Sequence, residues 1–284
     1  MVRTYVINVR QFDEEDAFRA ALPAVSPYRQ KKIALLKNER EKRRSLGAAF
    51  ALNAALKYYG MCEQNMEYVL GEQGKPMFRD CPELSFSLSH SGDYAICSLG
   101  ERETGCDIER VRPDKMRVAE RFYAEEEKAW IYQADVLKEQ ESRMFRIWTM
   151  KESFLKVTGC GMALPLKDFA VLIGKDGINE VRHSLNNKRY RIKEYSLPDF
   201  FQETEEYRIS VCAEDWAGRH SGGCGVWEGR SFAGCESLEE RPLAACETLK
   251  EADFSGFEKR EFAPELEIVS VGNEPGGPDS WQIP

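Results

Sequence analysis

Apolar and polar residues alternate over the first nine positions, with Val2, Thr4 and Val6 on one side, and this two-residue period predicts a β-strand. The basic segment 26–60 carries apolar residues at helical spacing in its second half, which predicts a helix that ends near Gly60. Three short strand-like segments follow, with the sequences KPMF, LSFSLSHSG and YAICSLG. The first part of the chain is therefore expected to combine a sheet with helices.

A second block repeats this order. It opens with the strand-like GCDIERV, continues with helical patterns around residues 118–133 and 143–158, and closes with the strand-like FAVLI, YRIKEYSL and YRISVCA. The two blocks end in the similar edges YAIC and YRISVC. The pattern predicts an α/β protein, of the α+β kind, with two comparable subdomains at residues 1–105 and 106–216.

The periodicity fades after residue 216. Residues 217–284 are rich in Gly, Ser, Glu and Pro, and they hold most of the net charge of −8 of the chain. We expect a loosely structured acidic tail. A weak eleven-residue spacing of Cys224, Cys235 and Cys246 leaves a folded repeat as the alternative, which the glycines and the proline oppose.

The composition is that of a soluble globular protein. The longest apolar runs fall far short of the roughly 20 residues of a membrane span, and the N-terminus lacks the basic and apolar blocks of an export signal. Nine cysteines without a C-x-x-C pair argue against both a disulfide framework and a zinc site. These observations predict a cytoplasmic protein.

The stretch WTMKESFLK, residues 148–156, lies in a predicted helix. Apolar residues at Ile147, Met150 and Phe154 form a buried stripe, whereas Glu152 and Lys156 stand four residues apart on the other side, in line with a tryptophan. Such a pair is usually surface support. The helix alone leaves open whether this side is solvated or is a reaction centre.

Two further stretches carry donors suited to phosphate. An apolar strand, residues 84–88, is expected to end in a hydroxyl-rich turn that holds Ser89, His90 and Ser91. The turn GKP presents Lys75. The alternatives are a capping histidine and a solvated loop lysine.

The strand-like GCDIERV places Asp107 and Glu109 on one face, about 7 Å apart along the strand. Carboxylate oxygens are ligands for Mg²⁺, and Glu152 would complete a set of three. The alternative is a charged edge strand.

A basic block between residues 29 and 44 offers cations for a phosphate. Acidic residues interrupt it and no aromatic residues interleave with it, which favours a discrete terminal phosphate over a polynucleotide. A nucleic-acid-binding protein remains an alternative and would show a strong salt dependence of DNA binding.

The ordered set GKP, FSLSHSG, GCDIE and FRIWTMKESFLK resembles the motifs of the Sfp-type 4′-phosphopantetheinyl transferases. Their pattern is a GKP turn, an SHSG segment, a G-x-D-x-E strand and a W-x-x-KE-x-x-K helix. All four elements are present in order, and the resemblance covers residues 1–216.

The resemblance implies two α/β subdomains in pseudo-twofold arrangement, with the active site and coenzyme A in the cleft between them. It also implies Mg²⁺-dependent transfer of 4′-phosphopantetheine from coenzyme A to a serine of an apo acyl or peptidyl carrier protein, with release of 3′,5′-ADP. The form of the fourth motif is similar to that of members that serve nonribosomal peptide and polyketide synthetases.

The resemblance assigns roles motif by motif. The metal ligands are Asp107, Glu109 and Glu152, and Glu152 and Lys156 also count as catalytic. Glu127 is a candidate base for the carrier serine, with a metal-bound water as the alternative. The coenzyme A contacts are Arg29, Lys32, Arg43, Arg44, Lys75, Ser89, His90, Lys151 and Lys156.

We expect a monomer that binds neither nucleic acid nor a membrane. The main alternative is a catalytically silent coenzyme A- or nucleotide-binding module on the same fold. The intact carboxylates and lysines favour the enzyme.

Overall fold

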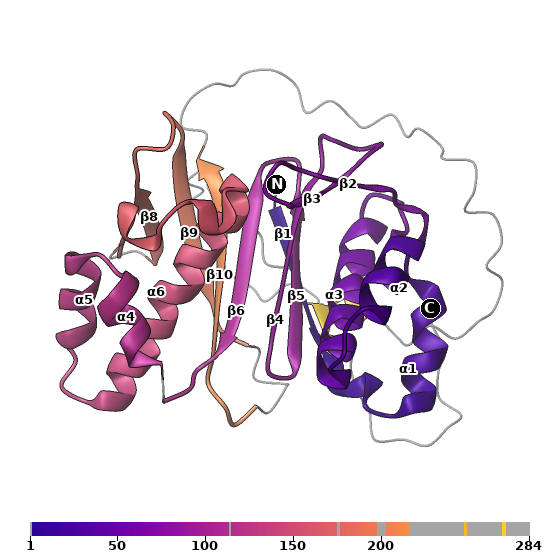
Figure 1. The fold of residues 1–284 in the computed structure, drawn as a ribbon, viewed down its shortest axis with the longest axis horizontal. Helices are drawn as coiled ribbons and strands as arrows, with labels where there is room; N and C mark the ends of the chain where they lie inside the picture. Colours follow the sequence, from indigo (N-terminus) through magenta and orange to yellow (C-terminus); the bar gives the residue numbers. More distant parts are fainter. Residues whose placement is uncertain are drawn as a thin grey trace.

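The computed structural model describes residues 2–113, 115–174, 177–197 and 203–215, together with the pairs 247–248 and 269–270 (Figure 1). Its helices and antiparallel sheets confirm the α+β class. The tail beyond residue 216 lies outside the described residues except for two short strands, β11 (Glu247–Thr248) and β12 (Val269–Ser270), which pair with each other.

The first sheet has the antiparallel order β1 (Val2–Asn8), β5 (Tyr94–Gly100) and β4 (Ser85–Ser91). The long helix α3 (Glu39–Lys57) packs on it, and the apolar side chains between them form the first core. The remaining elements of this half are η1 (Val9–Phe12), α1 (Glu15–Ala21), η2 (Leu22–Ala24), α2 (Pro27–Ala34), η3 (Glu63–Asn65), β2 (Tyr68–Leu70) and β3 (Pro76–Phe78).

The second sheet has five antiparallel strands in the order β6 (Thr104–Arg110), β10 (Tyr207–Asp215), β9 (Arg189–Tyr195), β8 (Ile178–Arg182) and β7 (Ala170–Leu172). Helix α6 (Leu137–Thr158) packs on it and, with α4 (Met116–Phe122) and α5 (Glu125–Tyr132), encloses the second core. Two short 3-10 helices, η4 (Gly161–Ala163) and η5 (Leu166–Asp168), follow α6.

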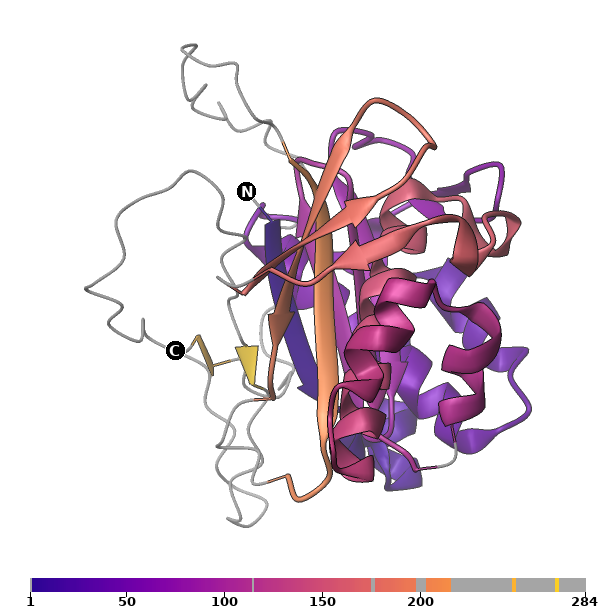
Figure 2. The same ribbon diagram turned by 90° about the vertical axis from the view of Figure 1, so that its left-hand side faces the viewer.

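The two sheets meet at their edge strands, β4 and β6, which lie side by side in the middle of the molecule (Figure 1). Figure 2 shows the strands on one side and the helices on the other. A third core lies on the strand face away from the helices, and it draws side chains from both sheets, including Tyr94, Ile96, Ile108 and Tyr207. The two halves therefore share one continuous interior.

Helix α6 approaches β6 more closely than a side chain would allow. A Cβ atom on Gly105 would lie 2.0 Å from the carbonyl oxygen of Ser153 and 2.5 Å from the amide nitrogen of Val157. Glycine at this position lets the last two turns of α6 rest against the backbone of β6. This contact fixes where Glu152 and Lys156 stand relative to the strand.

Several predicted elements differ in their bounds from the structure. The predicted turn SHSG is mostly strand, because Ser89, His90 and Ser91 belong to β4 and the turn follows at Gly92, whose φ of +58° suits glycine. The helical pattern around residues 118–133 is divided into α4 and α5. The helix predicted around residues 143–158 begins earlier, at Leu137.

None of the helices among the described residues is long and apolar enough to cross a membrane.

We predict that Gly105→Ala destabilises the protein, because the new methyl group must push α6 away from β6. Overpacking of this kind costs about 1–3 kcal/mol, and chemical denaturation measures it. The matched control is Gly71→Ala, where the nearest atom to the added Cβ is 3.5 Å away and an unstrained change is expected. Equal stability of both variants would contradict the close contact.

Candidate active site

Asp107 lies at the centre of the site, on the face of β6 that meets α6. Its side chain is 6% exposed. One oxygen, Oδ1, accepts hydrogen bonds from Lys156 Nζ at 2.7 Å and from Ser89 Oγ at 2.6 Å. The other, Oδ2, is buried and has no hydrogen-bond partner among the described residues. A buried carboxylate oxygen without a partner is costly, so this atom is open to a further ligand.

Lys156 reaches Asp107 from the last turn of α6. Its ammonium group also donates to the carbonyl oxygen of Cys106, at 3.0 Å. Burial is the largest single effect and lowers the pKa of Lys156, but the charges of Asp107, Cys106 and Glu152 and the hydrogen bond to Asp107 together outweigh it, so the pKa is raised. The lysine is therefore a fixed positive charge beside the acidic residues.

Glu109 and Glu152 stand near Asp107, one on the same strand and one on α6. Burial, and then the charge of Asp107, raises the pKa of Glu109. The same two causes raise the pKa of Glu152 to about 7, although Lys156 opposes the shift. The three carboxylates thus repel one another, and one lysine does not neutralise them.

We asked whether these residues fit a divalent cation. Within the described part of the chain, no three acidic, His or Cys side chains already stand at the spacing of metal ligands. One oxygen of Asp107 is bonded to Lys156 and Ser89, and Glu109 Oε2 accepts from Ser91 Oγ at 2.7 Å. The oxygen-only donor set, the partnerless Asp107 Oδ2 and the mutual repulsion nevertheless fit a hard cation such as Mg²⁺.

Glu127 and Lys151 form a buried ion pair with each other. Lys151 Nζ lies 2.9 Å from Glu127 Oε1, and both side chains are wholly buried. The ammonium also donates to the carbonyl oxygens of Leu166 and Phe169, each at 2.7 Å. Lys151 therefore joins the helix to the following loop and does not point to an open phosphate site, which differs from the expected contact with coenzyme A.

Glu127 is held on both oxygens. Oε2 accepts from the amide of Ala124 at 2.9 Å, which caps the start of α5, and Oε1 accepts from the amide of Val171 at 2.7 Å. Burial raises its pKa, and the charge of Lys151 opposes that shift. Both carboxylate oxygens of Glu127 are thus engaged by groups of this chain, and its assignment as the base stays a prediction.

Arg29 belongs to a second buried cluster, in the first half. Its side chain is 3% exposed and its Nε lies 3.7 Å from Glu63 Oε1. Glu63 also accepts from the amide and hydroxyl of Ser26 and from the hydroxyl of Tyr68. The cluster ties α2 to η3 and β2, and Arg29 is buried within it, although its Nε and Nη2 make no hydrogen bond among the described residues.

The other basic residues of this block remain nearer the surface. Arg44 Nε donates to the carbonyl oxygen of Gly92 at 2.7 Å and its Nη1 lies 2.6 Å from Glu41. Arg43 pairs with Asp13 at 3.0 Å. Both arginines stand on the first turns of α3, and Arg44 reaches the β4–β5 turn directly.

The imidazole of His90 lies near Glu41, the acid that also pairs with Arg44. Its Nδ1 lies 4.0 Å from Glu41, so the histidine and Arg44 flank one carboxylate. Burial lowers the pKa of His90, against the opposing effect of Glu41. Burial and the charge of Arg29 likewise lower the pKa of Lys32, on α2.

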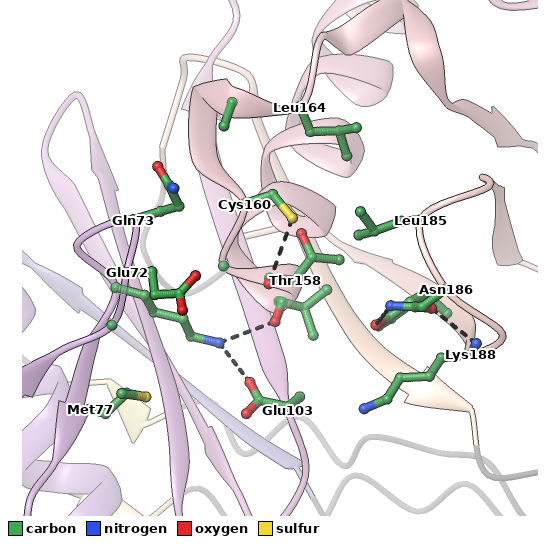
Figure 3. Close-up of a pocket in the computed structure, with 16 residues that line it drawn as sticks. Glu72, Gln73, Met77, Glu103, Thr158, Cys160, Leu164, Leu185, Asn186 and Lys188 are labelled. Atoms are coloured by element: carbon green, nitrogen blue, oxygen red, sulfur yellow. Dashed lines mark hydrogen bonds and ion pairs between the residues drawn. The ribbon is translucent and has the colours of Figure 1, made fainter.

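A pocket of about 650 Å³ opens between the β2–β3 loop and the end of α6 (Figure 3). Lys75 bridges the two halves there, with its ammonium 2.7 Å from Glu103 and 3.2 Å from the carbonyl oxygen of Val157. Cys160 and Leu164 line the side that belongs to the second half. Residues from both halves therefore form this pocket. Its lining includes Val157, the residue that follows Lys156 in the chain.

Comparisons with known proteins agree with these motifs. A family model described as the 4′-phosphopantetheinyl transferase superfamily matches residues 103–212. A 4′-phosphopantetheinyl transferase of Bacillus subtilis is 32% identical over 200 residues, which cover 70% of this chain and 85% of the relative. The chain belongs to the 4′-phosphopantetheinyl transferase family.

Two further members of this family are similar over most of their length. The 4′-phosphopantetheinyl transferase Sfp of Bacillus subtilis (strain 168) is 29% identical over 190 residues, covering 66% of this chain and 82% of the relative. The 4′-phosphopantetheinyl transferase gsp of Aneurinibacillus migulanus is 28% identical over 214 residues, covering 75% and 86%.

Sequence reasoning about this 4′-phosphopantetheinyl transferase missed the burial of Lys151, although a signal was present. Lys151 stands four residues after Ile147 and three before Phe154, and so falls in the apolar stripe of α6. Trp148, left unexplained by its spacing, packs against the second core. The reasoning also overlooked Ser91 as a partner of Glu109, because side-chain hydrogen bonds between distant strands leave no periodic signal.

We predict that the metal-free transferase loses stability as pH rises from about 4.5 to about 7. The folded state keeps the Glu152 proton up to about pH 7, whereas the ordinary value is 4.5, so between these values folding takes up a proton. Glu152→Gln stays neutral and should show a flatter pH dependence of the free energy of unfolding. Urea denaturation in the presence of a chelator measures it.

The exposed Glu139, on the same helix, supplies the control variant Glu139→Gln. If the free energy of unfolding depends on pH in the same way for the wild type and for Glu152→Gln, Glu152 does not have a raised pKa in the folded state.

Proposed function

We propose that this chain transfers the 4′-phosphopantetheine arm of coenzyme A to a serine of an apo acyl or peptidyl carrier protein and releases 3′,5′-ADP. The observation that carries the proposal is the contact of Lys156 with Asp107 beside Glu109 and Glu152. Membership of the 4′-phosphopantetheinyl transferase family supports it.

The reaction exchanges one P–O bond for another. The serine oxygen forms a bond to the phosphorus that bears the pantetheine arm, the bond from that phosphorus to 3′,5′-ADP breaks, and the serine proton leaves. Positioning and neutralisation of negative charge supply most of the catalysis in such a transfer. Lys156 is placed to neutralise the pyrophosphate, since its ammonium is fixed beside the acidic cluster.

A divalent cation is the second source of positive charge in this proposal. Asp107, Glu109 and Glu152 are the residues that would hold Mg²⁺, and the partnerless Asp107 Oδ2 supports this assignment. When bound, Mg²⁺ supplies Lewis-acid neutralisation of phosphate oxygens. The oxygen-rich cluster, with a single lysine among three acids, is suited to hold it.

The serine proton needs an acceptor near the reacting phosphorus. Glu127 is occupied by Lys151 and by two backbone amides. The alternative to Glu127, a water held by the cation, would then be the acceptor of the serine proton.

We further propose two subdomains in pseudo-twofold arrangement, with coenzyme A in the cleft between them. Each half has a long helix, α3 or α6, packed on an antiparallel sheet. The boundary falls before β6 and not at residue 105, because Thr104 already belongs to the second sheet. The contacts that we assign to coenzyme A are Lys32, Arg43, Arg44, Lys75, Ser89, His90 and Lys156.

The same arrangement supports a monomer, since one chain supplies both sides of the pocket. Arg29, Arg43 and Arg44 lie beside acids of this chain, which reduces the uncompensated positive charge that a polynucleotide would need. We also propose a cytoplasmic location, which is the location expected for an enzyme that uses coenzyme A and carrier proteins as substrates.

The test is incubation with coenzyme A, Mg²⁺ and a panel of apo carrier proteins, followed by intact-mass measurement. We expect a carrier to gain one phosphopantetheine. Asp107→Asn should lower the rate roughly 100-fold or more, because it removes a charge on which both the cation and Lys156 depend. The matched control is Asp168→Asn, at an exposed aspartate.

An absence of adduct on every carrier would favour the silent coenzyme A-binding module. A near-normal rate for Asp107→Asn would contradict the assignment of the site.

A further inference from the structure

Strands β4 and β6 are joined by serine side chains. Both are edge strands of their sheets, and their contacts keep a constant sequence offset of 19 residues, so they run parallel. The amides of Thr104, Cys106 and Arg110 on β6 donate to serine hydroxyls on β4, namely Ser85 at 3.2 Å, Ser87 at 3.0 Å and Ser91 at 3.1 Å. We call this row of hydroxyls the serine seam.

The seam satisfies amides that an edge strand would otherwise leave without partners. Four serines alternate along β4, at positions 85, 87, 89 and 91, and all face β6. Because hydroxyls stand between the strands, the two sheets form one surface without main-chain pairing. The junction of the two halves is therefore made of side chains.

Unlike Ser85 and Ser87, Ser91 also contacts the acidic cluster of Asp107, Glu109 and Glu152. Its Oγ accepts from the amide of Arg110 and lies 2.7 Å from Glu109 Oε2. A hydroxyl has one proton, and the amide already points at its oxygen, so the proton is directed to the carboxylate. The seam thereby fixes the orientation of Glu109, which also forms a longer ion pair with Arg112, at 3.8 Å.

We propose that Ser91 is a positioning residue that holds the Glu109 carboxylate in place for the cation, so that the junction of the two halves sets the geometry of the acidic cluster. This inference rests on the proposed function, since it needs Glu109 to be a ligand. Ser91 touches neither substrate nor cation in this account and acts through Glu109 alone.

The experiment compares Ser91→Ala with Ser87→Ala in the full chain. Ser87 is the matched control, because it is also buried and also accepts an amide of β6, yet it has no carboxylate partner. Both variants lose one seam hydrogen bond, so thermal unfolding should reveal similar destabilisation. Only Ser91→Ala removes a hydrogen bond to a charged group.

The decisive readout is direct binding of Mn²⁺, as a spectroscopic substitute for Mg²⁺, to the protein without coenzyme A. A hydrogen bond to a charged group contributes enough that its loss should weaken Mn²⁺ binding by roughly tenfold or more in Ser91→Ala. Ser87→Ala should stay within about twofold of wild type, and Ser91→Thr, which keeps the hydroxyl, should restore binding. In a Glu109→Ala background, Ser91→Ala should add no further loss.

The outcomes separate the inference from the proposed function. If the wild type binds Mn²⁺ and Ser91→Ala binds it with unchanged affinity, the proposed role of Ser91 is overturned. The metal assignment then still stands. Equal weakening in Ser91→Ala and Ser87→Ala would show that the seam acts only on stability, which also overturns it. Wild type that binds no Mn²⁺ would overturn the metal assignment and the inference with it.

Discussion

The site depends on the close approach of α6 to β6, which only a glycine at position 105 permits. Side chains return to the same face every two residues in a strand and every three to four residues in a helix. One fixed point of contact between β6 and α6 therefore determines which side chains meet. Asp107 follows Gly105 on the same face of the strand, and Lys156 lies where the helix meets it. The motif G-x-D-x-E therefore combines the glycine that permits the close helix contact with the two carboxylates that we propose as metal ligands.

That contact also decides how charge is distributed over α6. Glu152 and Lys156 are brought to the strand, whereas Lys151, adjacent in sequence, turns to the other side and is neutralised by Glu127 in the interior. The helix therefore carries one lysine in a buried ion pair and one beside the acidic residues. Three carboxylates lie around the second lysine, and burial together with the charge of Asp107 raises the pKa of Glu152 to about 7. This uncompensated acidity suits the cluster to bind a further positive charge.

Much of this arrangement is visible in the sequence, because periodicity reports which residues share a face. The spacing of Asp107 and Glu109 and that of Glu152 and Lys156 predicted two surfaces, and the structure brings those surfaces together. Periodicity does not report which polar residue is buried with a partner elsewhere. Arg29 with Glu63 and Lys151 with Glu127 are pairs of this kind, and the pattern of the sequence predicts coenzyme A contacts for the two cations. The serine seam depends on two strands becoming neighbours, which no local pattern predicts.

The central claim is that the pyrophosphate of coenzyme A meets Lys156 and the acidic cluster at the α6–β6 contact. A crystal structure of the protein with coenzyme A and Mg²⁺ tests it most directly. We expect the cation between the oxygens of Asp107, Glu109 and Glu152, with the pyrophosphate against Lys156. Coenzyme A bound with its pyrophosphate away from Lys156, or a cation held by other residues, would contradict the account.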